Sequence, residues 1–478
     1  GSGDTLTFLP QWYNLVLTMV AVSGIVEKFG GKRRSQWLSA LFVLTLPIVV
    51  LQASGSKNDI VLAFFFAALA YYVIKAANQK LSNIEFVLPG LAVGLGLLTK
   101  GNFPFFVLPL LAWLLVIMIK KAGWQRILLF IMIGLVSVTA MNAGHWIRNT
   151  LTFGGPLNVG GANFTLNTRF GLDVVISNLS RNIALQMMSI SPLDKIIIDM
   201  LTRLHALLGI SLFDQTITHG PPEFYSVPNR EEVASNPIHF GITVLVFIYL
   251  LIRLIIRKER NWQPLILGLT GMLGMVIFSA AFRWQTWGSR YFIPYYILFA
   301  PLVGFAIGDK LPRWTGWVLA IFLVIAMVHP LFNNYSRAFL PSESNRNNIW
   351  RLSRKGLRFA NHINYEGAVL GMTQKMADSG CQTYGLVESA NSSEYLIWST
   401  LRPDPSHYQI EHIAVDNPSA KHADQAFDPC GIIVFEVADP EIVAEESYRL
   451  VERWDFGSES GYPLSLFLKS EFAPLTLE

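Results

Sequence analysis

The chain has 478 residues, enough for two or three soluble domains, but its composition argues against that organisation. Hydrophobic residues make up 52% and charged residues only 15%, against about a quarter in typical soluble domains. The 37 lysines and arginines nearly balance the 33 acidic residues, which excludes a broad basic face for nucleic acid. The composition also excludes a disordered chain and an ordinary cytosolic enzyme. It indicates a protein that is mostly embedded in a membrane.

Ten apolar stretches are candidates for transmembrane helices, because a bilayer core needs about 20 mainly apolar residues per helix. They cover residues 8–26, 36–53, 60–76, 85–99, 103–119, 127–146, 238–256, 262–282, 291–308 and 315–333. The fourth and fifth are short, and only Lys100, Gly101 and Asn102 separate them. A re-entrant hairpin is therefore the alternative to two complete spans at that point.

The loops between these stretches differ in their content of lysine and arginine, which predicts the orientation of the chain. One alternating set is rich in basic residues, as in Lys32-Arg33-Arg34 and Lys120-Lys121, whereas the opposite set is nearly bare. The basic set is predicted to be cytoplasmic. Both termini, the long loop 147–237 and the tail 335–478 are then expected on the outer face.

The sequence changes character at about residue 335, which predicts a transmembrane domain over 1–334 and a separate outer domain over 335–478. Polar residues, prolines and short strands replace the long apolar runs. Alternating strands and helices indicate a small α/β domain closed by an antiparallel hairpin. The predicted strands are 382–388, 408–414, 431–437, 447–455 and 462–469, and the predicted helices are 346–361, 369–379 and 392–401.

Both cysteines, Cys381 and Cys430, fall in the outer domain, each one or two residues before a predicted strand. If those strands are neighbours in one sheet, the two side chains lie within reach of a disulfide. An oxidising compartment would allow the bond. The alternative is two unrelated buried thiols, and either way the role is structural.

Charged groups at the outer membrane surface need an explanation, because the bias that orients the chain excludes them there. The loop Ser54-Gly55-Ser56-Lys57-Asn58-Asp59 places a carboxylate at the start of the third helix. Helix capping explains Asp59 without function, and a carboxylate facing a polar cavity is the alternative. Lys100 stands at an outer helix end, where it either extends to lipid headgroups or binds a phosphate.

Two further clusters flank the long outer loop. His145, Arg148 and Asn149 lie where the sixth helix emerges, and simple lipid anchoring would explain the arginine. The segment from Asn229 to His239 closes the loop and contains Glu231, Glu232 and an Asn-Pro turn. The non-functional interpretation is a helix start with a solvated acidic pair. The functional one is a second carboxylate near the membrane.

The last cluster holds two arginines in one short outer loop, Arg283 and Arg290, followed by Tyr291. Its aromatic residues fit an interfacial belt. The arginine fork suits phosphate oxygens, so an anionic lipid headgroup is the natural ligand. Together the clusters place cations and carboxylates on one face of a membrane body. Transfer of a group from a lipid phosphate needs cations for the phosphate and a base for the acceptor hydroxyl.

These residues resemble the GT-C class of polytopic membrane glycosyltransferases that use polyprenyl-phosphate sugars. The likeness is greatest to the bacterial branch of protein mannosyltransferases and aminoarabinose transferases. It rests on short motifs spread over nearly the whole chain. They are Pro47 with Ser54-x4-Asp59, the segment 94–100 (GLGLLTK), Arg148-Asn149 before Phe153-Gly154-Gly155-Pro156, the segment 230–239, Arg290-Tyr291-x-x-Pro294, and Gly380-Cys381 with Glu394-Tyr395.

The resemblance implies inverting sugar transfer at the outer, periplasmic face of a bacterial inner membrane. Asp59 would be the acid of the second outer loop, and Lys100 and Arg290 would be phosphate ligands. Members of the class usually begin with a further helix and an outer loop that bears the principal catalytic acid. That segment is absent from this sequence. The resemblance therefore leaves two alternatives, a truncated sequence or a non-catalytic accessory subunit.

We therefore predict transfer of a sugar from a polyprenyl phosphate to a glycan, lipid or protein acceptor. Asp59 and either Glu231 or Glu232 are the expected catalytic acids. The expected phosphate ligands are Lys57, Lys100, Arg148, Arg283, Arg290 and Tyr291, with His145, Asn149 and His239 as further polar candidates. No cofactor motif is present and no obligatory metal is expected, although acids near His239 would allow a divalent ion.

A transporter or lipid flippase is a rival hypothesis from another functional class. Transport sites usually lie near the bilayer midplane, and no predicted span places a charge there. This argues against transport.

Overall fold

The computed structural model describes residues 6–158, 165–188, 191–224, 226–257, 261–340, 348–389, 392–401, 407–424, 426–444, 447–457 and 461–473. The chain forms two compact units. The helical unit contains the described residues up to Ile147 and from Thr165 to Asn334. The other unit contains Arg148 to Asn158 together with the described residues from Tyr335 onward.

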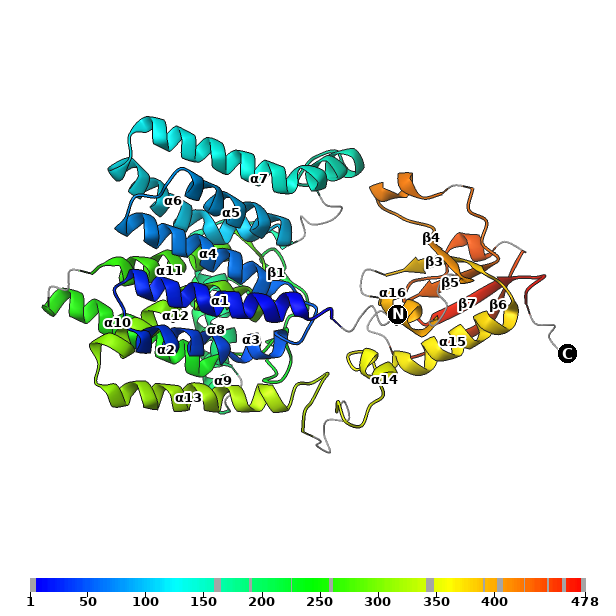
Figure 1. Cartoon of the computed structure of the whole chain (residues 1–478). Coiled ribbons are helices and arrows are strands. Elements are labelled where there is room, and N and C mark those ends of the chain that lie inside the picture. The colour runs from blue at the N-terminus through cyan, green and yellow to red at the C-terminus, as the bar shows by residue number, and fades with distance from the viewer. Residues whose placement is uncertain are drawn as a thin grey trace. The chain divides into compact units, whose positions relative to one another are not determined.

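Helices make up nearly all regular structure of the helical unit (Figure 1). They are α1 (Leu9–Lys28), α2 (Arg33–Leu44), α3 (Pro47–Gln52), α4 (Asp59–Asn78), α5 (Val87–Thr99), α6 (Phe103–Lys121), α7 (Trp124–Phe153), α8 (Leu172–Met187), α9 (Leu193–Leu208), α10 (Pro237–Arg257), α11 (Gln263–Ala281), α12 (Ile293–Phe305) and α13 (Arg313–Phe332). Short 3-10 helices precede α5 (η1, Ile84–Phe86) and α12 (η3, Thr286–Phe292), and a π-helical turn follows α12 (η4, Ala306–Lys310). Two-residue strands β1 (Thr218–His219) and β2 (Trp284–Gln285) pair in parallel.

Among the described residues, eight helical segments are long and apolar enough to cross a membrane, which confirms the predicted helical membrane body. All ten predicted stretches contain helix, but two are shorter than expected. The stretch 36–53 is divided into α2 and α3, because Pro47 removes a backbone donor and restricts the residue before it. The stretch 85–99 yields the 13-residue helix α5.

Helix α12 lies at the centre of the helical unit, and all of its residues are buried. It packs against α1, α2, α4 and α11 (Figure 1). Its close contact with α2 depends on glycine: a Cβ atom added at Gly304 would lie 2.0 Å from Ser39 Oγ. Small residues at such contacts are typical of membrane helix packing. The central position of α12 fixes the polar residues that directly precede it.

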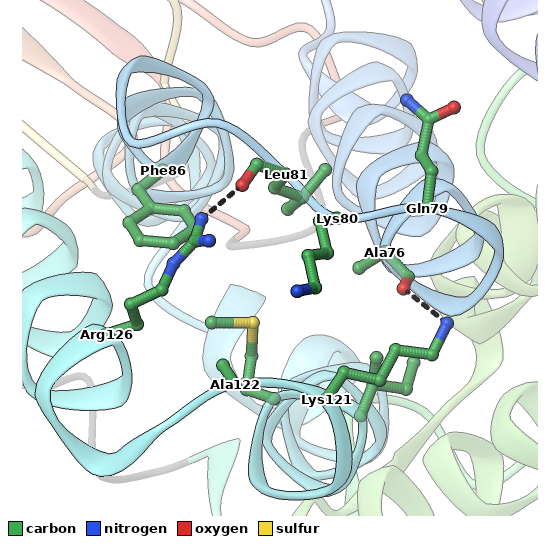
Figure 2. A pocket seen from close by; sticks show the side chains of 10 residues that line it. Ala76, Gln79, Lys80, Leu81, Phe86, Lys121, Ala122 and Arg126 are labelled. Atoms are coloured by element: carbon green, nitrogen blue, oxygen red, sulfur yellow. Dashed lines mark hydrogen bonds between the residues drawn. The ribbon is translucent and has the colours of Figure 1, made fainter.

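A small cavity lies at the end of α4 opposite Asp59, next to η1 and the start of α7 (Figure 2). Arg126 donates to the carbonyl of Leu81 (2.5 Å), and Lys121 donates to that of Ala76 (3.2 Å), as Figure 2 shows. The cavity measures about 20 Å³, roughly the space for one water molecule. Lys121 and Arg126 therefore bind backbone carbonyls at and just after the end of α4. The cavity between them is too small for a substrate.

The second unit contains a five-stranded sheet with strand order β4-β3-β5-β7-β6 (Figure 1). The strands are β3 (Thr383–Glu388), β4 (Gln409–His412), β5 (Gly431–Phe435), β6 (Tyr448–Trp454) and β7 (Leu464–Lys469). β3 runs parallel to β4 and β5, and β7 runs antiparallel to β5 and β6. All five predicted strands are present, and the predicted α/β fold with its closing hairpin is confirmed.

The helices of this unit are α14 (Arg354–Arg358), α15 (Tyr365–Ser379) and α16 (Glu394–Leu401). The predicted helix over 346–361 was wrong within the described residues, because only the short α14 forms there. Ser353 caps its start by accepting a hydrogen bond from the backbone N–H of Gly356 (3.2 Å). A cap at this position fixes where the helix begins, so it cannot extend to earlier residues.

Cys381 and Cys430 form a disulfide, with their Cα atoms 5.8 Å apart. They precede β3 and β5, which are parallel neighbours in the sheet. The backbone N–H of Cys430 also donates to Thr383 Oγ1 (3.1 Å). The bond therefore joins the starts of two adjacent strands.

Candidate functional site

Asp59 and Lys100 form an ion pair between the start of α4 and the residue that follows α5. The Asp59 side chain is only 3% exposed, and that of Lys100 is 21% exposed. The second carboxylate oxygen, Oδ2, is buried and has no hydrogen-bond partner among the described residues. This oxygen therefore retains its capacity to accept a proton or a hydrogen bond.

Gln11 takes the capping role that the sequence allowed for Asp59. Its Oε1 accepts hydrogen bonds from the backbone N–H groups of Ile60 (3.0 Å) and Val61 (3.3 Å). Gln11 also hydrogen-bonds Gln52, the last residue of α3, at 3.4 Å. The first turn of α4 is thus satisfied by α1, and the Asp59 carboxylate remains directed to Lys100.

Tyr291 brings Lys100 and Arg290 together over one aromatic ring. Lys100 Nζ lies 5.0 Å from the ring centroid and Arg290 Cζ lies 5.3 Å from it. Arg290 also donates to the Tyr291 hydroxyl at 3.5 Å and interacts electrostatically with Asp59 and Glu232. Its Nε is buried without a hydrogen-bond partner in the described part of the chain. Two cations therefore share one site with a buried carboxylate.

A second ion pair, Lys57 with Glu232, lies beside this cluster. Burial alone would raise the pKa of Glu232, but the hydrogen bond from Lys57 and the charges of Lys57 and Arg290 lower it below its usual value. Glu232 is thus ionised at neutral pH. Glu231 contributes its backbone carbonyl, which accepts from Gln52 Nε2 (3.1 Å). The cationic cluster is defined here as Lys57, Asp59, Lys100, Glu232, Arg290 and Tyr291.

An apolar cavity of about 420 Å³ begins at the residue after Tyr291. Phe292 and Tyr295 line it, together with side chains from α8, α10 and α11 such as Ile183, Phe240 and Met275. Tyr291 of the cationic cluster and Phe292 of the cavity lining are consecutive residues of η3. Such an arrangement suits a ligand with an anionic head and a hydrocarbon chain.

Two predicted site residues of the helical unit, Arg283 and His239, contact residues other than those of the cationic cluster. Arg283 interacts electrostatically with His219. Burial and the positive charge of this arginine lower the pKa of His219. His239 is buried, and its Nε2 hydrogen-bonds Thr45 Oγ1 at 3.1 Å while its ring packs against Phe42. These contacts assign His239 to helix packing rather than to a metal site with the glutamates.

The other predicted residues lie on α7. His145 belongs to the helical unit, whereas Arg148 and Asn149 belong to the unit that contains the sheet. Asn149 Nδ2 donates to the carbonyl of Pro156 (3.3 Å), so it fixes the turn after the helix. Arg148 is therefore not part of the compact unit that holds the cationic cluster.

Arg181, a fully buried arginine on α8, is not among the residues predicted from the sequence. It donates to the Leu212 carbonyl (2.9 Å), Thr218 Oγ1 (2.8 Å) and Asn178 Oδ1 (2.5 Å), and lies over the Trp284 ring. Burial lowers its pKa to about 9. A charged residue within the amphipathic pattern of α8 was the available signal. Arg181 thus joins α8 to the segment that contains Leu212 and Thr218.

Comparisons with known proteins agree with this architecture. Residues 1–143 match the family of dolichyl-phosphate-mannose-protein mannosyltransferases. A search of curated proteins gave no significant match. Among solved structures, ArnT from Cupriavidus metallidurans bound to undecaprenyl phosphate superposes with a TM-score of 0.51 and 13% identity, covering 96% of this chain and 83% of that chain.

Two other solved structures show weaker likeness. ArnT in the apo state gives a TM-score of 0.40 at 12% identity, covering 96% of this chain and 83% of that one. The oligosaccharyltransferase of Archaeoglobus fulgidus, in complex with zinc and sulfate, gives 0.42 at 12% identity, covering 96% and 61%. Both scores are too low to support a shared fold. The match of the first 143 residues and the ArnT likeness, together with the helical body and the sheet, identify a fold of the GT-C class of polytopic membrane glycosyltransferases.

Proposed function

We propose that this protein transfers a sugar from a polyprenyl-phosphate donor to an acceptor hydroxyl at the outer face of a bacterial inner membrane. The observation that carries this proposal is the cationic cluster. Lys100 and Arg290 share the Tyr291 ring beside the buried carboxylate of Asp59. The lysine and arginine distribution supports an outer location for the cluster and for the sheet-containing unit.

The apolar cavity supports a lipid-linked donor. Phe292, which follows Tyr291 in η3, lines it together with three residues of α12. We infer that a phosphate on Lys100 and Arg290 would place its isoprenoid chain in this cavity. Arginine binds phosphate through two parallel N–H groups, and lysine adds a point charge. The similar structure of ArnT is bound to undecaprenyl phosphate, which supports the same ligand chemistry here.

The proposed reaction breaks the bond between the sugar C1 and the phosphate oxygen. The acceptor oxygen attacks C1 from the opposite side, which inverts the configuration. The bond electrons return to the phosphate, where Lys100 and Arg290 stabilise the added charge. Asp59 takes the acceptor proton, with Glu232 as the second acid of the site. When Lys100 engages the phosphate, the Asp59 carboxylate is released from its ion pair and is available to the acceptor hydroxyl.

Binding of undecaprenyl phosphate to the purified chain in lipid nanodiscs tests the ligand assignment. Loss of one charged hydrogen-bond partner costs about 1.5–3 kcal/mol, so Lys100→Ala and Arg290→Ala should each weaken binding at least tenfold. Arg169→Ala is the matched control, because Arg169 pairs with Asp173 and Asp214 in the outer loop. Equal binding by all three variants and the wild type would contradict the assignment.

Sugar transfer itself separates an enzyme from an accessory subunit that only binds lipid. Undecaprenyl phosphate carrying tritiated mannose, glucose or aminoarabinose is incubated with membrane extract as the acceptor source. Transfer by the wild type and its loss in Asp59→Asn would support the enzyme. Lipid binding without transfer of any of the three sugars would favour the accessory subunit.

A further inference from the structure

A group of metal-ligating side chains lies at the carboxyl ends of two parallel strands in the sheet-containing unit. Glu388 is the last residue of β3, and His412 is the last residue of β4. Glu394 begins α16, which follows β3 in the chain. One ligand atom from each of the three residues lies within 4.8 Å of the other two. Parallel strands place their carboxyl ends at one sheet edge, where ligands of α/β folds commonly bind.

Both carboxylates are oriented by side chains outside the group. Ser392 Oγ donates to Glu388 Oε2 (2.8 Å), and Trp398 Nε1 donates to Glu394 Oε1 (2.7 Å). Each glutamate is thus left with one oxygen that faces the His412 ring. Glu388 Oε1 lies 3.9 Å from Nδ1, and Glu394 Oε2 lies 3.4 Å from Nε2. Hydrogen bonds of this kind fix the direction of metal-ligating carboxylates.

The charges around the two carboxylates, among the described residues, favour a bound cation. In the described part of the chain, neither Glu388 nor Glu394 pairs with a lysine or arginine, and the half-exposed His412 is their one basic neighbour. One oxygen of each carboxylate lies within 4.8 Å of the other, and like charges at this distance repel each other. A divalent cation would neutralise both and accept the imidazole nitrogen as a third ligand.

We propose that Glu388, Glu394 and His412 form a site for a divalent transition metal, with Zn²⁺ the best match. One imidazole nitrogen and two carboxylate oxygens are typical zinc ligands, and water would complete the tetrahedron. Small rotations of the two glutamate side chains would bring the three atoms around one ion. The metal would join β4, an edge strand of the sheet, to β3 and α16. This site is independent of the proposed sugar transfer.

Zinc titration of the full chain, without a histidine tag and treated with EDTA, tests the proposal by calorimetry. Absorption of bound Co²⁺ reports the geometry in parallel. The wild type is expected to bind one zinc ion more than the double variant Glu388→Gln/Glu394→Gln. His412→Ala should weaken binding at this site at least tenfold. Glu411→Gln is the matched control, since Glu411 precedes His412 on β4 and hydrogen-bonds Gln409 instead.

The thermal midpoint of unfolding gives a second readout. Zinc should raise it in the wild type and in Glu411→Gln, but not in the double variant. Size-exclusion profiles and the intact disulfide establish that the variants are folded. Equal zinc stoichiometry and affinity in the wild type and the folded double variant would overturn the proposal, as would no saturable binding to the wild type.

Discussion

Asp59 and Lys100 are 41 residues apart in the sequence, yet their side chains pair at the ends of α4 and α5 with the carboxylate almost fully buried. Removing one partner of a buried pair leaves an uncompensated charge, which is more costly than removing both. This asymmetry distinguishes a true pair from two neighbouring but independent charges.

Lys100→Met should therefore lower the free energy of unfolding on the order of 2–3 kcal/mol, somewhat below the effect for a fully buried pair. The double variant Asp59→Asn/Lys100→Met should recover most of this loss, because no charge remains buried. Equilibrium unfolding in detergent micelles measures both. Additive effects of the two substitutions would show that the pair contributes no coupling.

The Tyr291 ring is expected to contribute more than its hydroxyl to the affinity for undecaprenyl phosphate. Tyr291→Leu removes the surface over which Lys100 and Arg290 lie, and a cation–π contact contributes about 0.5–2 kcal/mol. Affinity for undecaprenyl phosphate should fall about tenfold. Tyr291→Phe keeps the ring and loses only the long hydrogen bond from Arg290, so affinity should change about twofold. Equal losses in the two variants would assign the effect to the hydroxyl.

Glu232 should contribute stability that depends on pH. Its pKa is lowered in the folded state, because Lys57 and Arg290 outweigh the effect of burial. The unfolded chain therefore binds its proton more readily than the folded one. The contribution is full above the ordinary value of 4.5 and is lost as pH falls through the lowered pKa.

The stability difference between the wild type and Glu232→Gln should accordingly be constant from pH 7 down to about 5 and shrink below it. It should not exceed about 1 kcal/mol, since both partners are partly exposed. Thermal unfolding between pH 3.5 and 7 measures it, with the exposed Glu27→Gln as control. A difference that grows in acid would contradict the sign.

The membrane body and the five strands could be predicted from hydrophobic patterns, which are local properties of the sequence. The break at Pro47 and the short length of α5 were harder to predict. Hydropathy alone does not show where the helix within an apolar run is interrupted. Asp59, Lys100 and Arg290 could be selected because charge is rare at that membrane surface. The contacts among these three residues could not be predicted, since they depend on how α4, α5 and α12 pack.

The long segment between α7 and α10 shows the opposite case. Its order depends on Arg181, which hydrogen-bonds carbonyl and side-chain oxygens from distant parts of the loop. No spacing rule connects residue 181 with Leu212 or Thr218. Arg283 and His239 are residue types that suit a phosphate site or a metal site. In the folded chain, however, Arg283 lies near His219 and His239 hydrogen-bonds Thr45.

Arg181→Met should destabilise the segment between α8 and α10 on the order of 3 kcal/mol, because several buried acceptors lose their donor. Limited proteolysis should then cut between residues 191 and 224 faster than in the wild type. Arg203→Met is the control, since Arg203 forms an exposed pair with Asp199 whose loss costs about 1 kcal/mol or less. Equal cleavage rates in the two variants would contradict this role for Arg181.

A cryo-electron microscopy structure of the chain in nanodiscs with undecaprenyl phosphate tests the central claim most directly. The account predicts phosphate density in contact with Lys100 and Arg290 beside Tyr291, with the isoprenoid chain in the apolar cavity along α12. Lipid phosphate bound elsewhere, with the Asp59–Lys100 pair intact and the cavity empty, would contradict it.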